Sequence, residues 1–281
     1  MDCIEGAVDL HVHSSPDVEP RRFDDIELAR EAARAGMAAI LIKSHQNSTV
    51  ERAYLVSRVV SGIQVFGGVV LNYPSGGLNV DAVRVALALG ARQIWMPTRD
   101  SRNHRRFHGQ PGGISVCDAD GQLVPEAEEI CRMLAATDCI LGTGHLDPHE
   151  GMVLVERALE MGIRRIVVTH PEWAATRYTV ASQMELAKRG VFFERCFVST
   201  THRCGFTPFS ELFDAAAQVG CSTTVLSTDL GQPDTPAPVE GMREYARQLR
   251  AYGFDATDIH RMIAENPAYL LGLASRDPAG G

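Results

Sequence analysis

The run Ala7-Val8-Asp9-Leu10-His11-Val12-His13 lies close to the start of the chain and has the apolar character of a buried strand. Side chains alternate faces along a strand, so His11 and His13 are expected to point the same way. Neutral imidazole is the commonest protein ligand for a zinc-like metal. The pair therefore predicts half of a metal site, unless the two histidines are only surface or capping residues.

An apolar strand followed by a helical segment recurs eight times along the chain. The expected strands are 7–13, 38–45, 64–72, 92–98, 139–145, 164–170, 191–198 and 223–229. The expected helices are 24–35, 50–61, 80–89, 125–136, 152–161, 180–189, 209–219 and a C-terminal extension over 239–273 that breaks near Gly253. Glycine after a helix and proline or aspartate at its start set most of these limits.

This alternation favours a (β/α)8 barrel of the TIM type. Apolar strands separated by amphipathic helices indicate a parallel sheet that is covered on its faces. Eight such units close naturally into a barrel, and 281 residues suit one. An open doubly wound sheet is the alternative, but no Gly-x-Gly-x-x-Gly run follows an expected strand. We expect a single domain over 1–281, with its core at 7–273.

Composition excludes several classes of protein. A net charge of −8 argues against a general nucleic-acid binder. The sequence contains no apolar run long enough to span a bilayer and no signal peptide at Met1, so we expect no membrane partner. Seven scattered cysteines without a Cys-x-x-Cys pair indicate reduced thiols and a cytoplasmic protein.

Metal-ligating side chains gather where the expected strands end, which is where TIM barrels carry their active sites. The strand ends carry His11 and His13, Lys43 and His45, His145, His170, Glu194, and Asp229. Several imidazoles and a carboxylate that converge on one barrel mouth predict a site for a divalent metal, with zinc expected.

The order of these motifs resembles the amidohydrolase superfamily. The run from Glu265 to Leu273, with Asn-Pro-Ala ahead of Leu-Gly, is similar to the closing helix of that superfamily. The resemblance implies that His11, His13 and Asp229 hold one metal. His145 and His170 then hold a second metal, or His145 joins the first site while His170 orients water.

The sequence departs from the superfamily on the fourth strand, where two-metal members carry a bridging lysine or glutamate. Ile94-Trp95-Met96-Pro97-Thr98 offers neither residue. Lys43 or Glu194 could replace the bridging group, but each could equally contact substrate or form an internal ion pair. The number of metal ions therefore stays open between one and two.

A basic segment follows the fourth strand and favours an anionic substrate. Residues 99–108 include four arginines and two histidines, and a glycine-rich run over 109–113 could act as a hinge. Arginine pairs with carboxylate or phosphate in bidentate geometry. We expect Arg99, Arg105 and Arg106, together with Glu194, to bind substrate, and Arg195 and Arg203 could add to the same field. A solvated loop or a subunit contact is the alternative.

Together these features predict a metal-dependent hydrolase that cleaves an amide, cyclic amide or ester bond in a small molecule. A bound metal lowers the pKa of water toward about 7 and polarises a carbonyl. Asp229 would act as general base and then general acid, with His170 and Lys43 as further catalytic residues. A non-oxidative decarboxylase of the same superfamily and a polymerase-and-histidinol-phosphatase-type phosphoesterase are the alternatives. The resemblance also implies a homo-oligomer.

Overall fold

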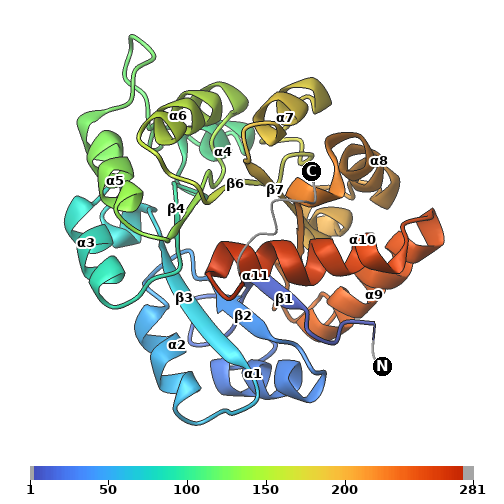
Figure 1. Ribbon diagram of the computed structural model, residues 1–281. Helices are drawn as coiled ribbons and strands as arrows, with labels where there is room; N and C mark the ends of the chain where they lie inside the picture. The colour runs from blue at the N-terminus through green and yellow to red at the C-terminus, as the bar shows by residue number, and fades with distance from the viewer. Residues whose placement is uncertain (1–2, 275–281) are drawn as a thin grey trace.

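Eight parallel strands form one sheet in which every strand pairs with its sequence neighbour, in the order β1 to β8. The computed structural model describes residues 3–274. Figure 1 shows the strands surrounding a central axis with the helices outside them. The strands are β1 Val8–Val12, β2 Ala39–Ile42, β3 Gln64–Val70, β4 Gln93–Trp95, β5 Ile140–Gly142, β6 Ile166–Thr169, β7 Phe192–Cys196 and β8 Thr224–Ser227. The predicted (β/α)8 barrel is confirmed, and each observed strand lies within its predicted range.

The helices that cover the sheet also follow the predicted order. They are α1 Asp25–Arg34, α2 Val50–Ser57, α3 Val80–Ala88, α4 Arg102–Phe107, α5 Pro125–Ala135, α6 Pro148–Glu160, α7 Val180–Ala187, α8 Phe209–Val219, α9 Pro238–Tyr252, α10 Ala256–His260 and α11 Asn266–Leu271. Short 3-10 turns occupy η1 Tyr73–Ser75, η2 Phe197–Thr200, η3 His202–Cys204 and η4 Cys221–Thr223. A π-helical turn, η5 Arg261–Glu265, joins α10 to α11. Within residues 3–274, no helix is both long and apolar enough to cross a membrane.

Two helices differ from the sequence prediction because their caps decide where they begin. The Asp147 side chain accepts from the backbone N–H of Glu150, so α6 begins at Pro148 and not at Met152. The segment after β4 was expected to be a polar loop, but the Ser101 side chain accepts from the N–H of His104 and starts α4. This short helix places its side chains in directions that a loop prediction does not give.

The barrel closes between β1 and β8 through a few backbone contacts. The Asp229 N–H donates to the His11 carbonyl at 2.7 Å, and the His13 N–H donates to the Leu230 carbonyl at 2.8 Å. The register of β1 against β2 shifts between Asp9 and Val12, which marks a bulge. Three candidate metal ligands therefore lie on this seam.

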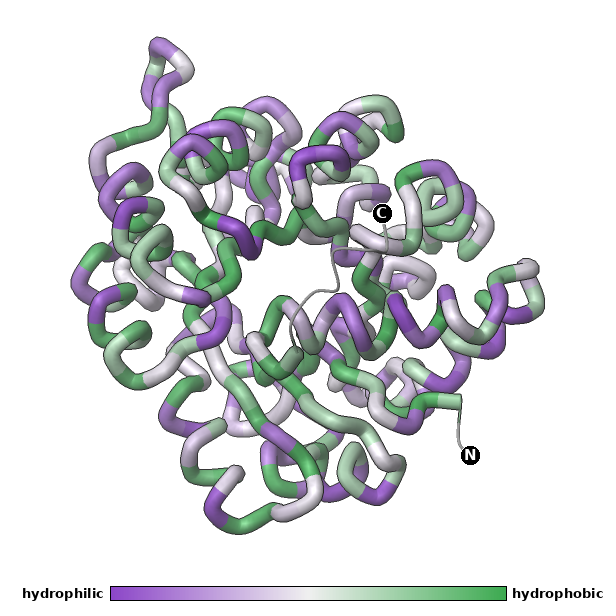
Figure 2. Tube along the Cα trace, in the orientation of Figure 1, coloured by the Kyte–Doolittle hydropathy of each residue, from purple (hydrophilic) through white to green (hydrophobic). Residues whose placement is uncertain are grey.

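The barrel interior is apolar at the end that α11 covers. Leu10, Leu41, Trp95 and Phe192 are buried there, and Leu270 and Leu271 of α11 pack against the same cluster. Figure 1 shows α11 lying across this end of the barrel. In Figure 2 the strands around the centre are largely hydrophobic. The helices that surround them alternate between hydrophobic and hydrophilic residues. Because α11 closes one end, polar chemistry is confined to the opposite end, where the strands finish.

The Asn-Pro-Ala motif at the start of α11 has a structural position. The Asn266 side-chain amide donates to the carbonyls of Cys221 at 2.7 Å and Thr224 at 2.6 Å. These bonds fix the closing helix to the start of β8 and keep Asn266 away from the barrel mouth.

Replacing Asp9 with alanine is expected to lower the free energy of unfolding by about 2–4 kcal/mol, because buried donors lose their acceptor. The Asp9 carboxylate accepts from the Thr228 N–H at 3.0 Å, the Thr228 hydroxyl at 2.5 Å and the His11 N–H at 3.2 Å. Urea unfolding of the metal-free protein measures the change. A loss as small as that of Asp81→Ala on the exposed surface of α3 would contradict the assignment.

The same carboxyl gives a pH dependence with a defined sign. Burial raises the pKa of Asp9 from 3.8 to about 7, although the Thr228 hydrogen bonds lower it. Between these values the unfolded chain releases the proton first, so stability falls as the pH rises through this window. Asp9→Asn should remove this fall when metal-free samples are unfolded at about pH 4 and about pH 8.

Candidate metal centre

Two strand ends of the centre adopt backbone conformations that non-glycine residues rarely use. His170 and Asp229 both have a φ of 52°. The His170 N–H donates to the Glu194 carbonyl at 3.1 Å, and the Asp229 N–H is held by His11 as described above. Left-handed backbone at non-glycine residues is strained and concentrates at functional sites. Both side chains are turned into the barrel mouth by this geometry.

The bulge in β1 turns His11 toward the same point. Leu10 belongs to the apolar interior cluster, whereas Val12 packs outward against the helices. A regular strand would place His11 opposite to Leu10, but the bulge lets both residues face the interior. His11 is 0% exposed and His13 is 1% exposed.

Three imidazoles meet on the carboxylate of Asp229. Oδ1 lies 3.0 Å from Nε2 of His11 and 2.8 Å from Nε2 of His13, while Oδ2 lies 3.2 Å from Nε2 of His170. Burial raises the pKa of Asp229, but contacts with these histidines hold it well below its usual range. Burial lowers the pKa of His13 and of His170. Burial also lowers the pKa of His11, but the Asp229 and Glu194 carboxylates raise it above its ordinary value. Ionised carboxylate and neutral imidazole are the forms that bind metals.

Lys43, Glu194 and Cys196 surround His11. The Lys43 amine lies 2.9 Å from Nε2 of His11, on the same side as Asp229. On the other side, Nδ1 of His11 lies 3.3 Å from the Glu194 carboxylate and 3.7 Å from the Cys196 sulfur. Glu194 is 0% exposed and lies against Nδ1 of His11, away from the Nε2 side that contacts Asp229. The substrate contact expected for Glu194 from the sequence remains a prediction.

Cys196 is the member of the centre that the sequence prediction missed. Ligand atoms of His11, His170, Cys196 and Asp229 all lie within 4.8 Å of one another. Cys196 follows Glu194 by two residues on β7, so both point to the same face. That spacing was the available signal, but from the sequence all seven cysteines are expected only to be reduced thiols.

His145 and His45 form no hydrogen bond or ion pair with Asp229 but lie next to the histidines that do. Nδ1 of His145 lies 2.9 Å from Nδ1 of His104, and the His145 ring is 5.6 Å from the His170 ring. His45 stacks on His13 at 5.1 Å and contacts the Thr98 hydroxyl at 2.9 Å. Burial lowers the pKa of His145 and of His45. Both rings line the mouth, and His104 of α4 is a further histidine that the sequence prediction did not single out.

A cavity of about 120 Å³ opens above Asp229. Arg99 and Arg203 line it, and each is already paired, Arg99 with Glu19 and Arg203 with Asp234. Arg105 and Arg106 do not line it. Arg105 donates to the Pro111 carbonyl at 2.8 Å, and Arg106 donates to the Asn103 side chain at 3.1 Å. The helical turn of α4 brings His104 and His108 to the cavity and turns these two arginines away. Arg195 is buried against Glu172 and Gln183 behind β7.

These donors suit a first-row transition metal. Imidazole nitrogen, carboxylate oxygen and thiol sulfur are the ligand types that zinc prefers. Nδ1 of His13 and Nδ1 of His170 are buried without a hydrogen-bond partner in the structure, so only their Nε2 sides are engaged, both toward Asp229. The residues therefore fit a metal at this point.

The sequence profile of a family of unknown function, DUF6282, matches residues 6–194. The chain belongs to DUF6282. The matched range contains His11, His13, Lys43, His145 and His170, and it ends before Cys196 and Asp229. No curated protein matches this DUF6282 chain.

Solved structures share the fold of this DUF6282 protein at low sequence identity. An amidohydrolase from Pseudomonas aeruginosa is 11% identical, with a TM-score of 0.69 and 96% of each chain covered. A phosphotriesterase homology protein from Escherichia coli, complexed with phosphate in its active site, is 14% identical, with a TM-score of 0.63 and coverage of 95% of this chain and 99% of that one. A probable dipeptidase from Pseudomonas aeruginosa is 11% identical, with a TM-score of 0.62 and coverage of 95% and 94%. The resemblance to the amidohydrolase superfamily is confirmed at the level of the fold.

Replacing Gly231 with alanine is expected to destabilise the DUF6282 protein by about 2–5 kcal/mol, because the added methyl group cannot fit. Gly231 has a φ of 134°, and a Cβ there would lie 1.9 Å from the His13 carbonyl oxygen. Gly62, with a φ of 82° and nothing within 4 Å, is the control for the conformational penalty alone. Thermal unfolding compares the two variants, and equal losses would show that the close approach to His13 is unimportant.

Proposed function

We propose that this DUF6282 protein is a metal-dependent hydrolase that activates water to cleave an amide, cyclic amide or ester bond of a small substrate. The observation that carries the proposal is the convergence of three histidine Nε2 atoms on Asp229 at 2.8–3.2 Å. The mouths of (β/α)8 barrels are where such enzymes place their catalytic groups. A homo-oligomeric state and a cytoplasmic location remain predictions.

We propose that His11, His13, His170 and Asp229 hold the metal, with Cys196 as an additional ligand and His145 for a second ion. Zinc is the ion that these ligand types favour, and one or two ions are compatible with the number of ligands. A bound zinc ion supplies a water of lowered pKa and polarises the carbonyl of the substrate.

The protein side chains then have separate tasks. The Asp229 carboxylate, ionised because of its histidine contacts, accepts the proton of the attacking water and returns it to the leaving group. Glu194 accepts from Nδ1 of His11 and so fixes which ring nitrogen faces the centre. His170, whose Nε2 lies 3.2 Å from Asp229, would hold the metal and would lie beside the reacting carbonyl.

Anion recognition is assigned to Arg99 and Arg203 in place of Arg105 and Arg106. Arg203 uses Nε and Nη2 for Asp234, which leaves Nη1 for a second carboxylate. Arg99 is bound by both oxygens of Glu19, so a substrate anion must share it. We therefore expect the cavity to bind a substrate that carries one acidic group.

Removal and return of metal tests the proposal. The zinc-loaded and chelator-treated proteins are assayed on a panel of esters, lactones and acyl amides, with products analysed by mass spectrometry in 18O-labelled water. We expect 18O in the product acid, loss of turnover after chelation and recovery with zinc. Carbon dioxide release without 18O uptake would identify the decarboxylase, and phosphate release from model esters would identify the phosphoesterase.

Replacing Cys196 with serine is expected to weaken metal binding at least about tenfold, since even partners of metal ligands are worth about 10- to 100-fold. Cobalt bound in place of zinc reports a thiolate ligand through near-ultraviolet charge-transfer absorption. That absorption should be present in the wild type and in Cys204→Ser, whose sulfur lines the cavity. Its persistence in Cys196→Ser would remove Cys196 from the ligand set.

A further inference from the structure

A second cavity, of about 300 Å³, adjoins the metal centre. It shares four lining residues with the cavity above Asp229, so the two cavities are direct neighbours. The shared residues are His108, Trp173, Arg203 and Cys204. Ligand pockets commonly combine such an apolar space with a few fixed polar groups.

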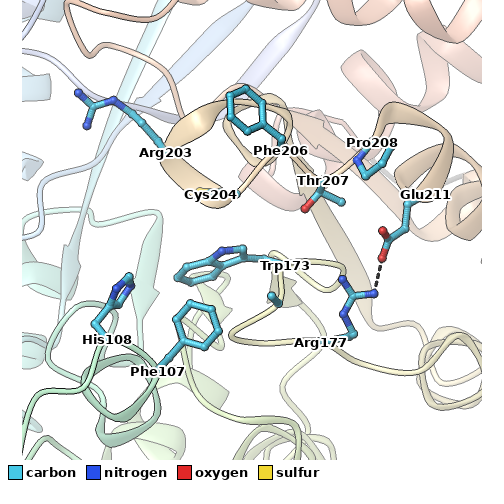
Figure 3. A pocket seen from close by; sticks show the side chains of 12 residues that line it. Phe107, His108, Trp173, Arg177, Arg203, Cys204, Phe206, Thr207, Pro208 and Glu211 are labelled. Carbon is cyan, nitrogen blue, oxygen red and sulfur yellow. Dashed lines mark hydrogen bonds and ion pairs between the residues drawn. The ribbon is translucent and has the colours of Figure 1, made fainter.

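Trp173 forms the wall between the two spaces. Its ring lies 5.1 Å from the His145 ring and 6.0 Å from the His170 ring on the side of the centre. It also lies 5.7 Å from Phe107. A group that extends from the centre past Trp173 therefore enters an aromatic environment (Figure 3).

Two exposed phenylalanines border this space on opposite sides. Figure 3 shows Phe206 above the gap, with Trp173 and Phe107 below it. Phe107 is 49% exposed and Phe206 is 66% exposed. Large apolar side chains that are exposed together at a cavity mark a binding surface more often than an accident of sequence.

The backbone at Phe206 is held in a conformation that this residue disfavours. Phe206 has a φ of 56°, directly after Gly205 at 81°. The flanking bonds that fix it run from the Phe206 N–H to Thr201 at 3.0 Å and from the Thr207 N–H to Ser199 at 2.8 Å. These bonds hold the strained backbone and leave the Phe206 ring exposed beside the cavity.

The far end of this space carries no net charge. Arg177 and Glu211 are paired across it, as the dashed line in Figure 3 shows. An uncharged group therefore fits better there than an anionic or cationic one, while the charged end of a ligand belongs beside Arg203.

We propose that this second cavity is the subsite for an apolar, aromatic-sized arm of the substrate, which names the substrate class as an aryl- or bulky-alkyl-substituted amide, ester or lactone. The inference rests on the proposed function for the position of the scissile bond. The arm packs between Phe206 on one side and Trp173 with Phe107 on the other, and offset aromatic stacking adds to its burial.

Hydroxamates of graded size test the subsite, because the chelating head anchors at the metal while the arm varies. Calorimetry on zinc-loaded protein compares acetohydroxamate with phenylaceto-, 3-phenylpropiono- and 4-phenylbutyrohydroxamate. We expect the best phenyl ligand to bind at least about tenfold tighter than acetohydroxamate. Phe206→Ala and Phe107→Ala should each reduce that ratio to about threefold or less without changing acetohydroxamate affinity. Tyr54→Ala, an exposed aromatic on α2 outside both cavities, should keep the ratio.

Equal affinities for the phenyl and methyl ligands, or a ratio untouched by both phenylalanine variants, would overturn the subsite and leave the proposed hydrolase standing. If the protein holds no metal, the proposed function fails, and metal-free protein is titrated with 3-phenylpropionamide and propionamide while intrinsic tryptophan fluorescence is followed. Trp173 borders the cavity, whereas the other tryptophan, Trp95, is buried in the apolar interior. Saturable quenching by the phenyl amide alone, lost in Phe206→Ala, would then still support the subsite. Identical titrations would overturn it.

Discussion

Replacing Asp229 with asparagine is expected to lower kcat/KM about a thousandfold or more on any ester, lactone or amide that the wild type cleaves. The asparagine side chain has nearly the same volume and cannot accept a proton at neutral pH. It also cannot offer two anionic oxygens to His11, His13 and His170, which lie 2.8–3.2 Å away. Both the proton acceptor and a metal ligand are lost in one change.

Steady-state kinetics with Asp81→Asn as the control measures this loss. Asp81 is an aspartate on the surface of α3, and its side chain is 84% exposed. The control should keep wild-type rates, and far-ultraviolet circular dichroism should show that both variants are folded. An Asp229→Asn protein that retains a tenth of wild-type activity would show that Asp229 is not the proton acceptor.

Replacing Lys43 with alanine is expected to lower kcat/KM about a hundredfold or more and to weaken binding of the metal ions. Lys43 is 1% exposed, its amine lies 2.9 Å from Nε2 of His11, and burial lowers its pKa. A divalent cation held by His11 would favour the neutral amine further. We propose that the neutral amine adds to carbon dioxide, forming an N–C bond and releasing one proton, and that the two oxygens of the resulting carbamate anion would bridge the metal ions.

Adding bicarbonate distinguishes a Lys43 carbamate from a lysine that only forms an ion pair. Metal-free protein should take up zinc faster or more completely with added bicarbonate, and 13C-labelled bicarbonate should give a protein-bound carbamate signal that Lys43→Ala lacks. Acetate or propionate should partly rescue Lys43→Ala, because a small carboxylate can occupy the vacated space. Lys188→Ala on the surface is the control. Wild-type metal uptake that ignores bicarbonate, with no labelled carbamate, would contradict the bridging role.

The sequence was sufficient to predict the barrel because each strand is continuous in apolar residues and each helix carries its own end signals. It also predicted His11, His13, His170 and Asp229, since the rule that barrel sites lie at strand ends needs no knowledge of packing. The bulge in β1 that aims His11 has no clear sequence mark. The expectation that His11 and His13 point the same way comes instead from the alternation of side chains along a regular strand.

The orientation of the residues around the centre could not be predicted in the same way. From the sequence alone, Arg105 and Arg106 are equivalent to Arg99, because no helix is expected in the basic segment after β4. The Ser101 cap turns it into α4, where neighbouring side chains diverge by about 100°. The roles of Glu194 and Cys196 depend on which nitrogen of His11 faces the proposed metal. That orientation is set by tertiary packing, so the sequence could not predict it.

Metal content distinguishes a metal centre in the barrel mouth from a cluster of histidines that only hydrogen-bond to Asp229. Purified wild-type protein, His11→Ala, Asp229→Asn and the control His260→Ala, which changes an exposed histidine on α10, are analysed after dialysis against limiting zinc. We expect one or two tightly held ions in the wild type and in His260→Ala, and a clear loss in the other two variants. A wild type without stoichiometric metal, or His11→Ala and Asp229→Asn proteins that keep the full amount, would contradict it.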